Sequence, residues 1–247
     1  MSRLDRVLGM ARSLAIYHGI PLRQRRLRRL YRQFVTPGSL VFDVGAHAGN
    51  RTRAFVSLGC RVVAVEPQPD FARLLRMLFG RSDRVDIVEA AVCEHDGPVS
   101  LAMSERTPTV TTVDAPWRQR RSDETGFAGV HWNRTIEIDG TTLDTLIDRF
   151  GMPALIKIDV EGSEPRVLAG LTRPVPVLSF EYLPTALDDV ARCLVRLGNL
   201  GSYTFNYSIG ESYRLASDDW LTAPQVLAAL DIARVTERCG DVYARLV

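Results

Sequence analysis

Lysine is almost absent from this sequence of 247 residues, and Lys157 is the only one. Long apolar runs are also absent: no stretch approaches the roughly 20 residues that a membrane-spanning helix needs, and no signal peptide is recognisable. The four cysteines stand singly, without a C-x-x-C pair or a metal-binding spacing. These absences argue against a membrane-spanning, disulfide-rich or cysteine–metal protein. They favour a cytoplasmic protein whose cysteines are reduced core thiols.

The composition that remains is typical of a soluble globular protein, with 46% hydrophobic and 24% charged residues. The length is most simply explained by one α/β domain. The net charge of +2 is spread unevenly, because residues 1–36 contain nine arginines and a single acidic residue. This segment is predicted to form two helices, over 3–18 and 22–34. We expect the second to pack on the domain with a solvated basic face, and the alternative is contact of residues 1–34 with an anionic membrane.

Residues 40–67 contain the pattern around which we expect the chain to be organised. The apolar run 40–42 is typical of a strand buried on both faces, and Asp43 ends it. Gly45 and Gly49 then allow a sharp turn and a close approach to a ligand. Asn50 or Thr52 should cap the helix that follows. This helix ends at Gly59, and a second strand over 61–65 brings Glu66 to its carboxyl end. The pattern indicates half of a nucleotide-binding βαβ unit.

The residues at these strand ends indicate the chemistry of the ligand. In open parallel sheets, ligands bind beyond the carboxyl ends of the strands, where Glu66 can accept hydrogen bonds from two ribose hydroxyls. The glycine spacing is Gly-x-x-x-Gly, unlike the dinucleotide fingerprint G-x-G-x-x-G. Asp43 also disfavours a phosphate and favours a neutral or cationic ligand. The pattern therefore points to S-adenosylmethionine, whose sulfonium is positive. Packing of helix on strand is the alternative role for the glycines.

Alternating strands and helices over the rest of the chain predict a doubly wound, mostly parallel sheet. The polar segment 104–133 is expected to be a flap-like loop near the substrate. Trp117, His131 and Trp132 in it would contact a ring-shaped acceptor or simply anchor the loop. Further strands are expected over 85–91, 99–103, 135–138, 154–158, 175–180, 203–207 and 242–247, and further helices over 68–79, 143–150, 164–169, 184–197 and 224–230.

A second constellation follows the strand over 154–158. Asp159, Glu161 and Glu164 come directly after it, and Glu181 ends the next strand. Like charges repel, so folding alone does not explain these carboxylates at one edge of a sheet. Glu164 has a structural reason, since a helix dipole favours an acid in its first turn. Asp159 and Glu181 should face a ligand, with Lys157 offsetting part of their charge.

The strings VFDVGAHAG, VEP, TTLDTL and IKIDVEGSEPRVLAG occur in this order between residues 41 and 170. In this the chain resembles the FkbM-type methyltransferases over roughly residues 40–207. The resemblance implies a class I Rossmann-like fold with a seven-stranded, mostly parallel sheet, which we place over residues 37–247. It also implies S-adenosylmethionine as cofactor. The Arg-rich extension 1–36 lies outside the match. His47 stands where the family often has Asn.

The resemblance also implies roles for individual residues. Asp159 would lie nearest the transferred methyl and take the hydroxyl proton, with Glu181 and His47 as the other candidates. Alternatively, Asp159 and Glu181 would hold Mg²⁺. Glu66, followed by Pro67, would bind the ribose. The methionine end and sulfonium would be held by Asp43, Gly45, Ala46 and Gly49, and the adenine would lie near Ala90 or Ala91. The loop 104–133 lies outside the match; from the residues themselves we expect the acceptor to contact Glu161, Trp117, His131 and Trp132.

We therefore expect an S-adenosylmethionine-dependent O-methyltransferase that acts on a hydroxyl of a small molecule. The preferred acceptor class is a sugar of a glycoconjugate, glycolipid or polysaccharide precursor, or a natural product. The alternatives are an NAD-dependent oxidoreductase and a non-catalytic scaffold attached to membranes through residues 1–34. No nucleic acid partner is expected, because no aromatic-rich basic groove is visible. A homodimer is an open alternative.

Overall fold

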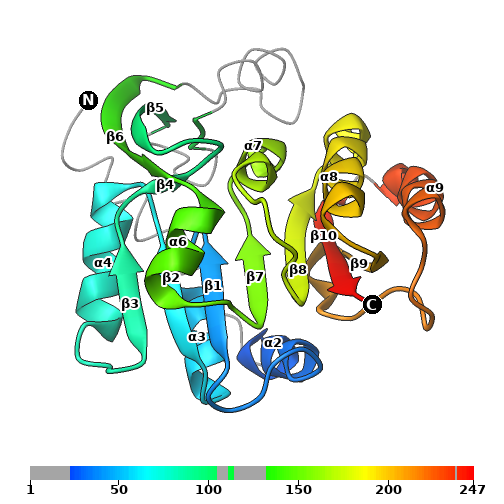
Figure 1. Cartoon of the computed structure of the whole chain (residues 1–247), viewed down its shortest axis with the longest axis horizontal. Coiled ribbons are helices and arrows are strands. Elements are labelled where there is room, and N and C mark those ends of the chain that lie inside the picture. The colour runs from blue at the N-terminus through cyan, green and yellow to red at the C-terminus, as the bar shows by residue number, and fades with distance from the viewer. Residues whose placement is uncertain (1–22, 105–110, 114–131, 237) are drawn as a thin grey trace.

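The computed structural model describes residues 23–104, 111–113, 132–236 and 238–247. Its centre is a seven-stranded sheet in the order β3-β2-β1-β7-β8-β10-β9 (Figure 1). β10 runs antiparallel to both of its neighbours, and the other pairs are parallel. The strands of this sheet are β1 (Leu40–Val44), β2 (Arg61–Val65), β3 (Val85–Val88), β7 (Leu155–Ile158), β8 (Val177–Tyr182), β9 (Tyr203–Ile209) and β10 (Gly240–Leu246). This confirms the predicted class I methyltransferase fold.

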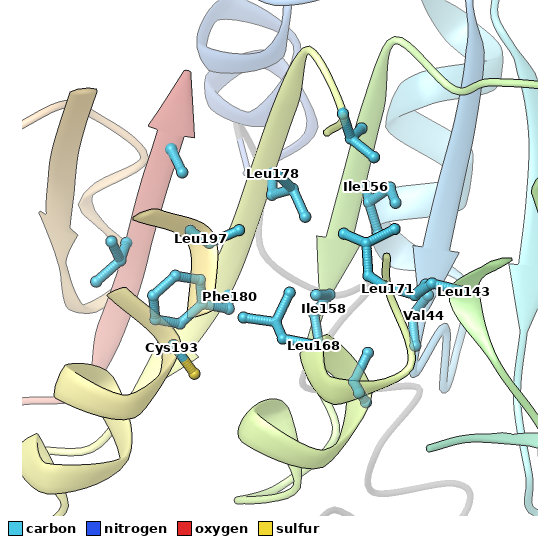
Figure 2. Packing of buried hydrophobic residues seen from close by; sticks show 14 of the residues in the cluster. Val44, Leu143, Ile156, Ile158, Leu168, Leu171, Leu178, Phe180, Cys193 and Leu197 are labelled. Carbon is cyan, nitrogen blue, oxygen red and sulfur yellow. The ribbon is translucent and has the colours of Figure 1, made fainter. Parts of the chain in front are cut away.

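Two layers of helices cover the sheet (Figure 1). On one face the strand residues pack with α6, α7, α8 and α9, and Figure 2 shows Ile158 and Phe180 meeting Leu168 and Leu197 there. On the other face α2 and α3 pack on Val41 and Leu155. The helices are α2 (Arg23–Tyr31), α3 (Asn50–Ser57), α4 (Pro69–Phe79), α6 (Leu143–Phe150), α7 (Glu164–Ala169), α8 (Leu187–Leu200) and α9 (Ala223–Ala233), with 3-10 turns η3 (Gly210–Ser212) and η4 (Arg234–Thr236).

A second, three-stranded sheet was not predicted. It has the order β4-β6-β5 and consists of β4 (Ala91–Val92), β5 (Gly97–Met103) and β6 (Arg134–Thr141). The expected single strand over 85–91 is therefore wrong at its end. The chain leaves the main sheet after Val88, and Ala91 and Val92 pair with β6 instead. This pairing joins residues almost fifty positions apart, so no local pattern could have revealed it.

α2 confirms one expectation about the basic extension and corrects another. Its apolar stripe is buried, with Leu27, Leu30 and Tyr31 at most 1% exposed. The basic face was expected to be solvated throughout, but Arg23 of this helix is buried and donates through Nε to the hydroxyl of Tyr213 at 2.8 Å. The helix predicted over 3–18 lies outside the described residues. Among those residues no helix has both the length and the apolarity that crossing a membrane requires.

Several local details differ from the sequence predictions. α3 begins after Gly49 without a side-chain cap, because Thr52 donates instead to Asp43 Oδ2 at 2.5 Å. The helix expected over 68–79 is present as α4, but its Leu78 does not face the core, since 48% of this residue is exposed. Cys239 is exposed, whereas the other three cysteines are buried free thiols as expected. α6 is capped by Thr142, whose Oγ1 accepts from the backbone N–H of Thr145 at 3.0 Å.

Candidate functional site

A cleft of about 840 Å³, open to solvent, lies at the carboxyl ends of β1, β2 and β7. This is the edge where ligands bind in open α/β sheets. Gly49, Glu181 and Trp132 do not line the cleft, and Trp117 and His131 lie outside the described residues. The predicted site residues that do line it are Asp43, Gly45, Ala46, His47, Glu66, Pro67, Ala90, Ala91, Asp159 and Glu161.

Glycine is required at both positions of the turn for a different reason from the main one expected. Both have positive φ, 78° at Gly45 and 75° at Gly49, which favours glycine. A Cβ on Gly45 would lie 1.9 Å from the carbonyl oxygen of Asp159, and a Cβ on Gly49 would lie 2.6 Å from the Phe79 ring. Protein atoms already occupy both positions. The glycines therefore permit close packing of the protein, rather than clearing space for a ligand.

Glu66 lies at the end of β2 and is only 2% exposed. Its Oε2 accepts from the backbone N–H of His47 at 2.7 Å, and its Oε1 accepts from that of Gln68 at 2.9 Å. Burial raises the pKa of this carboxyl to about 7, although the two backbone donors act to lower it. A carboxylate has about four acceptor sites, so Glu66 can accept two further hydrogen bonds from a ligand in the cleft.

His47 contacts α4 on the same side of the cleft as Glu66. Its ring lies 3.9 Å from the ring of Phe71, centroid to centroid. Burial lowers the pKa of His47 to about 4, against an opposing effect of Asp159. The imidazole is therefore neutral near pH 7. The residue also has a positive φ of 46°, which is uncommon outside glycine.

The sheet face under α2 and α3 changes from apolar to polar along its strands. Near the amino ends of β1, β7 and β8 it carries apolar residues that pack with α2 and α3. Strand register then aligns polar residues in consecutive rows. Because side chains two positions apart share a face, both rows lie on this side of the sheet. The first row holds Asp43, Lys157, Ser179 and Tyr243, and the second holds Asp159, Glu181 and Asp241.

Lys157 is the centre of a buried ion network in these rows. It has no exposed surface, and its Nζ lies 2.6 Å from Asp241 Oδ1 and 3.7 Å from Asp159 Oδ2. Burial acts against its charge, but Asp159 and Asp241 outweigh that effect, so the pKa of Lys157 is raised. The expected offset of carboxylate charge is present, although Asp241 is the nearer partner.

Arg51, on the first turn of α3, joins the same network. Its Nη1 lies 3.2 Å from Asp159 Oδ2, and its Nη2 lies 3.9 Å from Asp241 Oδ2. Sequence analysis missed both Arg51 and Asp241, because neither belongs to a recognised motif. Asp241 did leave a signal: it stands near the start of a mostly apolar terminal strand, and a charge that becomes buried there requires a partner.

Three carboxylates meet beside this network. The oxygens of Asp159, Glu161 and Glu181 lie within 4.8 Å of one another. Burial, followed by the charge of Asp159, raises the pKa of both Glu161 and Glu181. Within the described part of the chain, the basic residues of the network pair with Asp159 and Asp241 and leave both glutamates without an ion-pair partner. Such oxygens could accept a proton or bind a hard cation.

Residues 111–113 form a wall of the cleft. They belong to the segment 104–133 that was expected to lie near the substrate, although the sequence did not single out these three residues. The backbone of Thr112 exchanges hydrogen bonds with Ala102 at 2.9 and 3.1 Å. Arg166 Nη1 donates to the carbonyl of Val113 at 2.8 Å. The segment is therefore tied to both β5 and α7. Thr111 turns a buried hydroxyl to this region, and its Oγ1 has no hydrogen-bond partner among the described residues.

Comparison with known proteins identifies the family. Residues 43–240 match the family described as "Methyltransferase FkbM domain". Among solved structures, the O-methyltransferase from Bacillus cereus in complex with SAH is 14% identical, with 97% of this chain and 90% of that chain covered and a TM-score of 0.45. Precorrin-6y C5,15-methyltransferase from Geobacter metallireducens is 13% identical, with 92% and 87% covered and a TM-score of 0.47. No curated protein gave a significant match. The chain belongs to the FkbM family of S-adenosylmethionine-dependent methyltransferases.

Proposed function

We propose that the protein transfers the methyl group of S-adenosylmethionine to a hydroxyl oxygen of a small molecule, with a sugar as the preferred acceptor class. One observation carries this proposal. The cleft has a ribose-binding type of carboxylate, Glu66, at the end of β2, and a cluster of carboxylates begins at its other wall with Asp159 and Glu161. The first suits the cofactor, and the second suits a hydroxyl that must lose a proton.

The cofactor would lie across the ends of β1 and β2. Glu66 would accept hydrogen bonds from the two ribose hydroxyls through the acceptor sites that His47 and Gln68 leave open. Ala90 and Ala91, both buried and without bulky side chains, would contact the adenine. The methionine end would lie over the turn at Asp43–Gly49, close to Asp159. This order along the cleft directs the methyl group toward the carboxylates.

In the transfer step the acceptor oxygen forms a bond to the methyl carbon while the bond from that carbon to sulfur breaks. The sulfonium becomes a neutral thioether, and the hydroxyl proton passes to a carboxylate. Positioning supplies much of the rate in such a reaction, and a base adds about 10²–10⁴-fold.

Of the three sequence candidates for the base, we favour Glu181. Asp159 pairs with both Arg51 and Lys157, so its carboxylate is already engaged in the ion network. Glu181 has no such partner within the described residues and lies in the same cluster. His47 contacts Phe71 on the cofactor side of the cleft and is less suited to the role. Asp159 would then orient the acceptor and the cofactor.

Fewer structural observations bear on the acceptor class than on the cofactor. Carboxylates that lack cations suit neutral polyols and disfavour phosphorylated or otherwise anionic acceptors, because like charges repel. Trp132, within the segment that was expected to cover the substrate, is half-buried, although it does not line the cleft. Among the alternatives, the family match favours a methyltransferase over an NAD-dependent oxidoreductase.

The test is transfer of a labelled methyl group from S-adenosylmethionine to a panel of neutral sugars, sugar phosphates and phenols. We expect label in alkali-stable methyl ethers of the neutral sugars. Glu181→Gln should lower kcat by at least about 10² while cofactor affinity stays within about twofold. Loss of activity in EDTA and recovery with Mg²⁺ would assign Asp159 and Glu181 to a metal instead. Label on nitrogen or carbon acceptors alone would refute O-methylation.

A further inference from the structure

The amino-acid end of S-adenosylmethionine needs a partner that the sequence motifs do not supply. This end carries a carboxylate and an ammonium on one carbon atom. The motif residues expected to hold it are Asp43, Gly45, Ala46 and Gly49, and none of them is basic. Asp43 would repel a carboxylate. A buried anion requires a cation or several hydrogen-bond donors nearby, so a further residue must face it.

We infer that Arg51 binds this carboxylate and thereby orients the methionine end of the cofactor. The inference rests on the proposed use of the cleft for S-adenosylmethionine. Among the cleft-lining residues that the structure describes, Arg51 is the only Lys or Arg. The other ionisable residues of the lining are acidic, apart from His47 with its lowered pKa. Arg51 is therefore the one place in this lining where a carboxylate meets a fixed positive charge.

The guanidinium has hydrogen-bonding capacity left for a ligand. It offers five N–H donors, and its Nη1 and Nη2 form ion pairs with Asp159 and Asp241, respectively. Its Nε is buried and has no hydrogen-bond partner in the described parts of the chain. Buried donors are almost always satisfied in folded proteins. A ligand carboxylate that accepts from Arg51 would satisfy this one, in the bidentate geometry that guanidinium and carboxylate share.

The surroundings of Arg51 suit both halves of the amino-acid group. Arg51 lies in the first turn of α3, where helix N-termini favour anions. Its partner Asp159 lies 3.2 Å away and also lines the cleft. Because the ammonium and carboxylate of the ligand share a carbon, an ammonium beside Asp159 and a carboxylate on Arg51 form a matched pair. The ion network of Lys157 and Asp241 keeps both protein groups in place.

The experiment compares two ligands that differ only in the carboxylate, S-adenosylmethionine and its decarboxylated form, on the full chain by calorimetry. Wild type should bind the decarboxylated form about 10- to 100-fold more weakly. Arg51→Met should weaken S-adenosylmethionine by a similar factor and bind both ligands with nearly equal affinity. Arg51→Lys should recover part of the preference. Arg53→Met is the matched control, because Arg53 is exposed on the same helix, and its affinities should equal those of wild type.

Several outcomes would overturn the inference. If the wild-type protein binds the two forms equally, it has no group that recognises the ligand carboxylate. This result does not depend on whether a variant folds. Arg51→Met that weakens both ligands by the same factor would assign Arg51 a purely structural role. Wild type that binds neither ligand would refute the proposed cofactor site together with the inference, so the two failures are distinguishable.

Discussion

Replacing Lys157 by Met should strongly destabilise the protein, because it leaves a buried charge without its main partner. Lys157 has no exposed surface, and its ammonium lies 2.6 Å from Asp241 Oδ1. Removing one partner of a buried ion pair typically costs about 3–5 kcal/mol. Asp241 keeps a hydrogen bond from the hydroxyl of Tyr243 at 3.2 Å and a distant contact with Arg51 at 3.9 Å. We therefore expect the lower end of that range, about 3 kcal/mol.

The loss is measurable by heat or urea. For a chain of this size each kcal/mol shifts the melting temperature by roughly 2–4 °C, so Lys157→Met should lower it by about 6–12 °C. The double variant Lys157→Met with Asp241→Asn should lose less than the sum of the two single variants, because it removes both charges. Arg173→Met is a surface control: Arg173 is 40% exposed and pairs with Asp144 and Asp148, and its loss should cost at most about 1 kcal/mol.

Two results would refute this account of the network. Lys157→Met that melts at the wild-type temperature would show that the pair contributes no net stability. Additive losses in the double variant would show that the two residues act independently, despite their separation of 2.6 Å.

Three further predictions concern the cleft and the amino-terminal helix. Affinity for S-adenosylmethionine should rise between pH 6 and pH 8. The reason is that the pKa of Glu66 is about 7 in the folded protein, and ribose hydroxyls donate best to the ionised carboxylate. Calorimetry of Glu66→Gln should show weaker binding without this pH dependence. Gly45→Ala should destabilise the protein by several kcal/mol in urea unfolding, because its Cβ would lie 1.9 Å from the carbonyl oxygen of Asp159, whereas Gly198→Ala, with open space around it, should not. A chain that begins at residue 37 should lose stability by about 5 kcal/mol or more, because each large apolar side chain that α2 buries contributes about 1.5–3 kcal/mol; wild-type melting of this truncated chain would contradict that role of α2.

The sequence alone determined those features that adjacent residues specify. The run over 40–66 predicts strand, glycine turn, helix, strand and a terminal carboxylate, because hydrophobic period and turn residues act within a few positions. The structure has all of these elements, with Glu66 at the end of β2 and Asp159 after β7, next to β1. The seven-stranded sheet followed from the alternation of strands and helices and from the family motifs.

The tertiary structure decided what depends on residues far apart in the chain. Lys157 and Asp241 are separated by 84 positions, and only the pairing of β8 with its neighbours brings them to adjacent rows. Arg51 carries no signal in sequence, because an arginine in a helix is ordinarily solvated. The role of Arg51 depends on Asp159, the carboxylate that follows β7 and pairs with its guanidinium. Local patterns fix elements, whereas the partners of a buried charge are fixed by strand order and register, which are properties of the whole sheet.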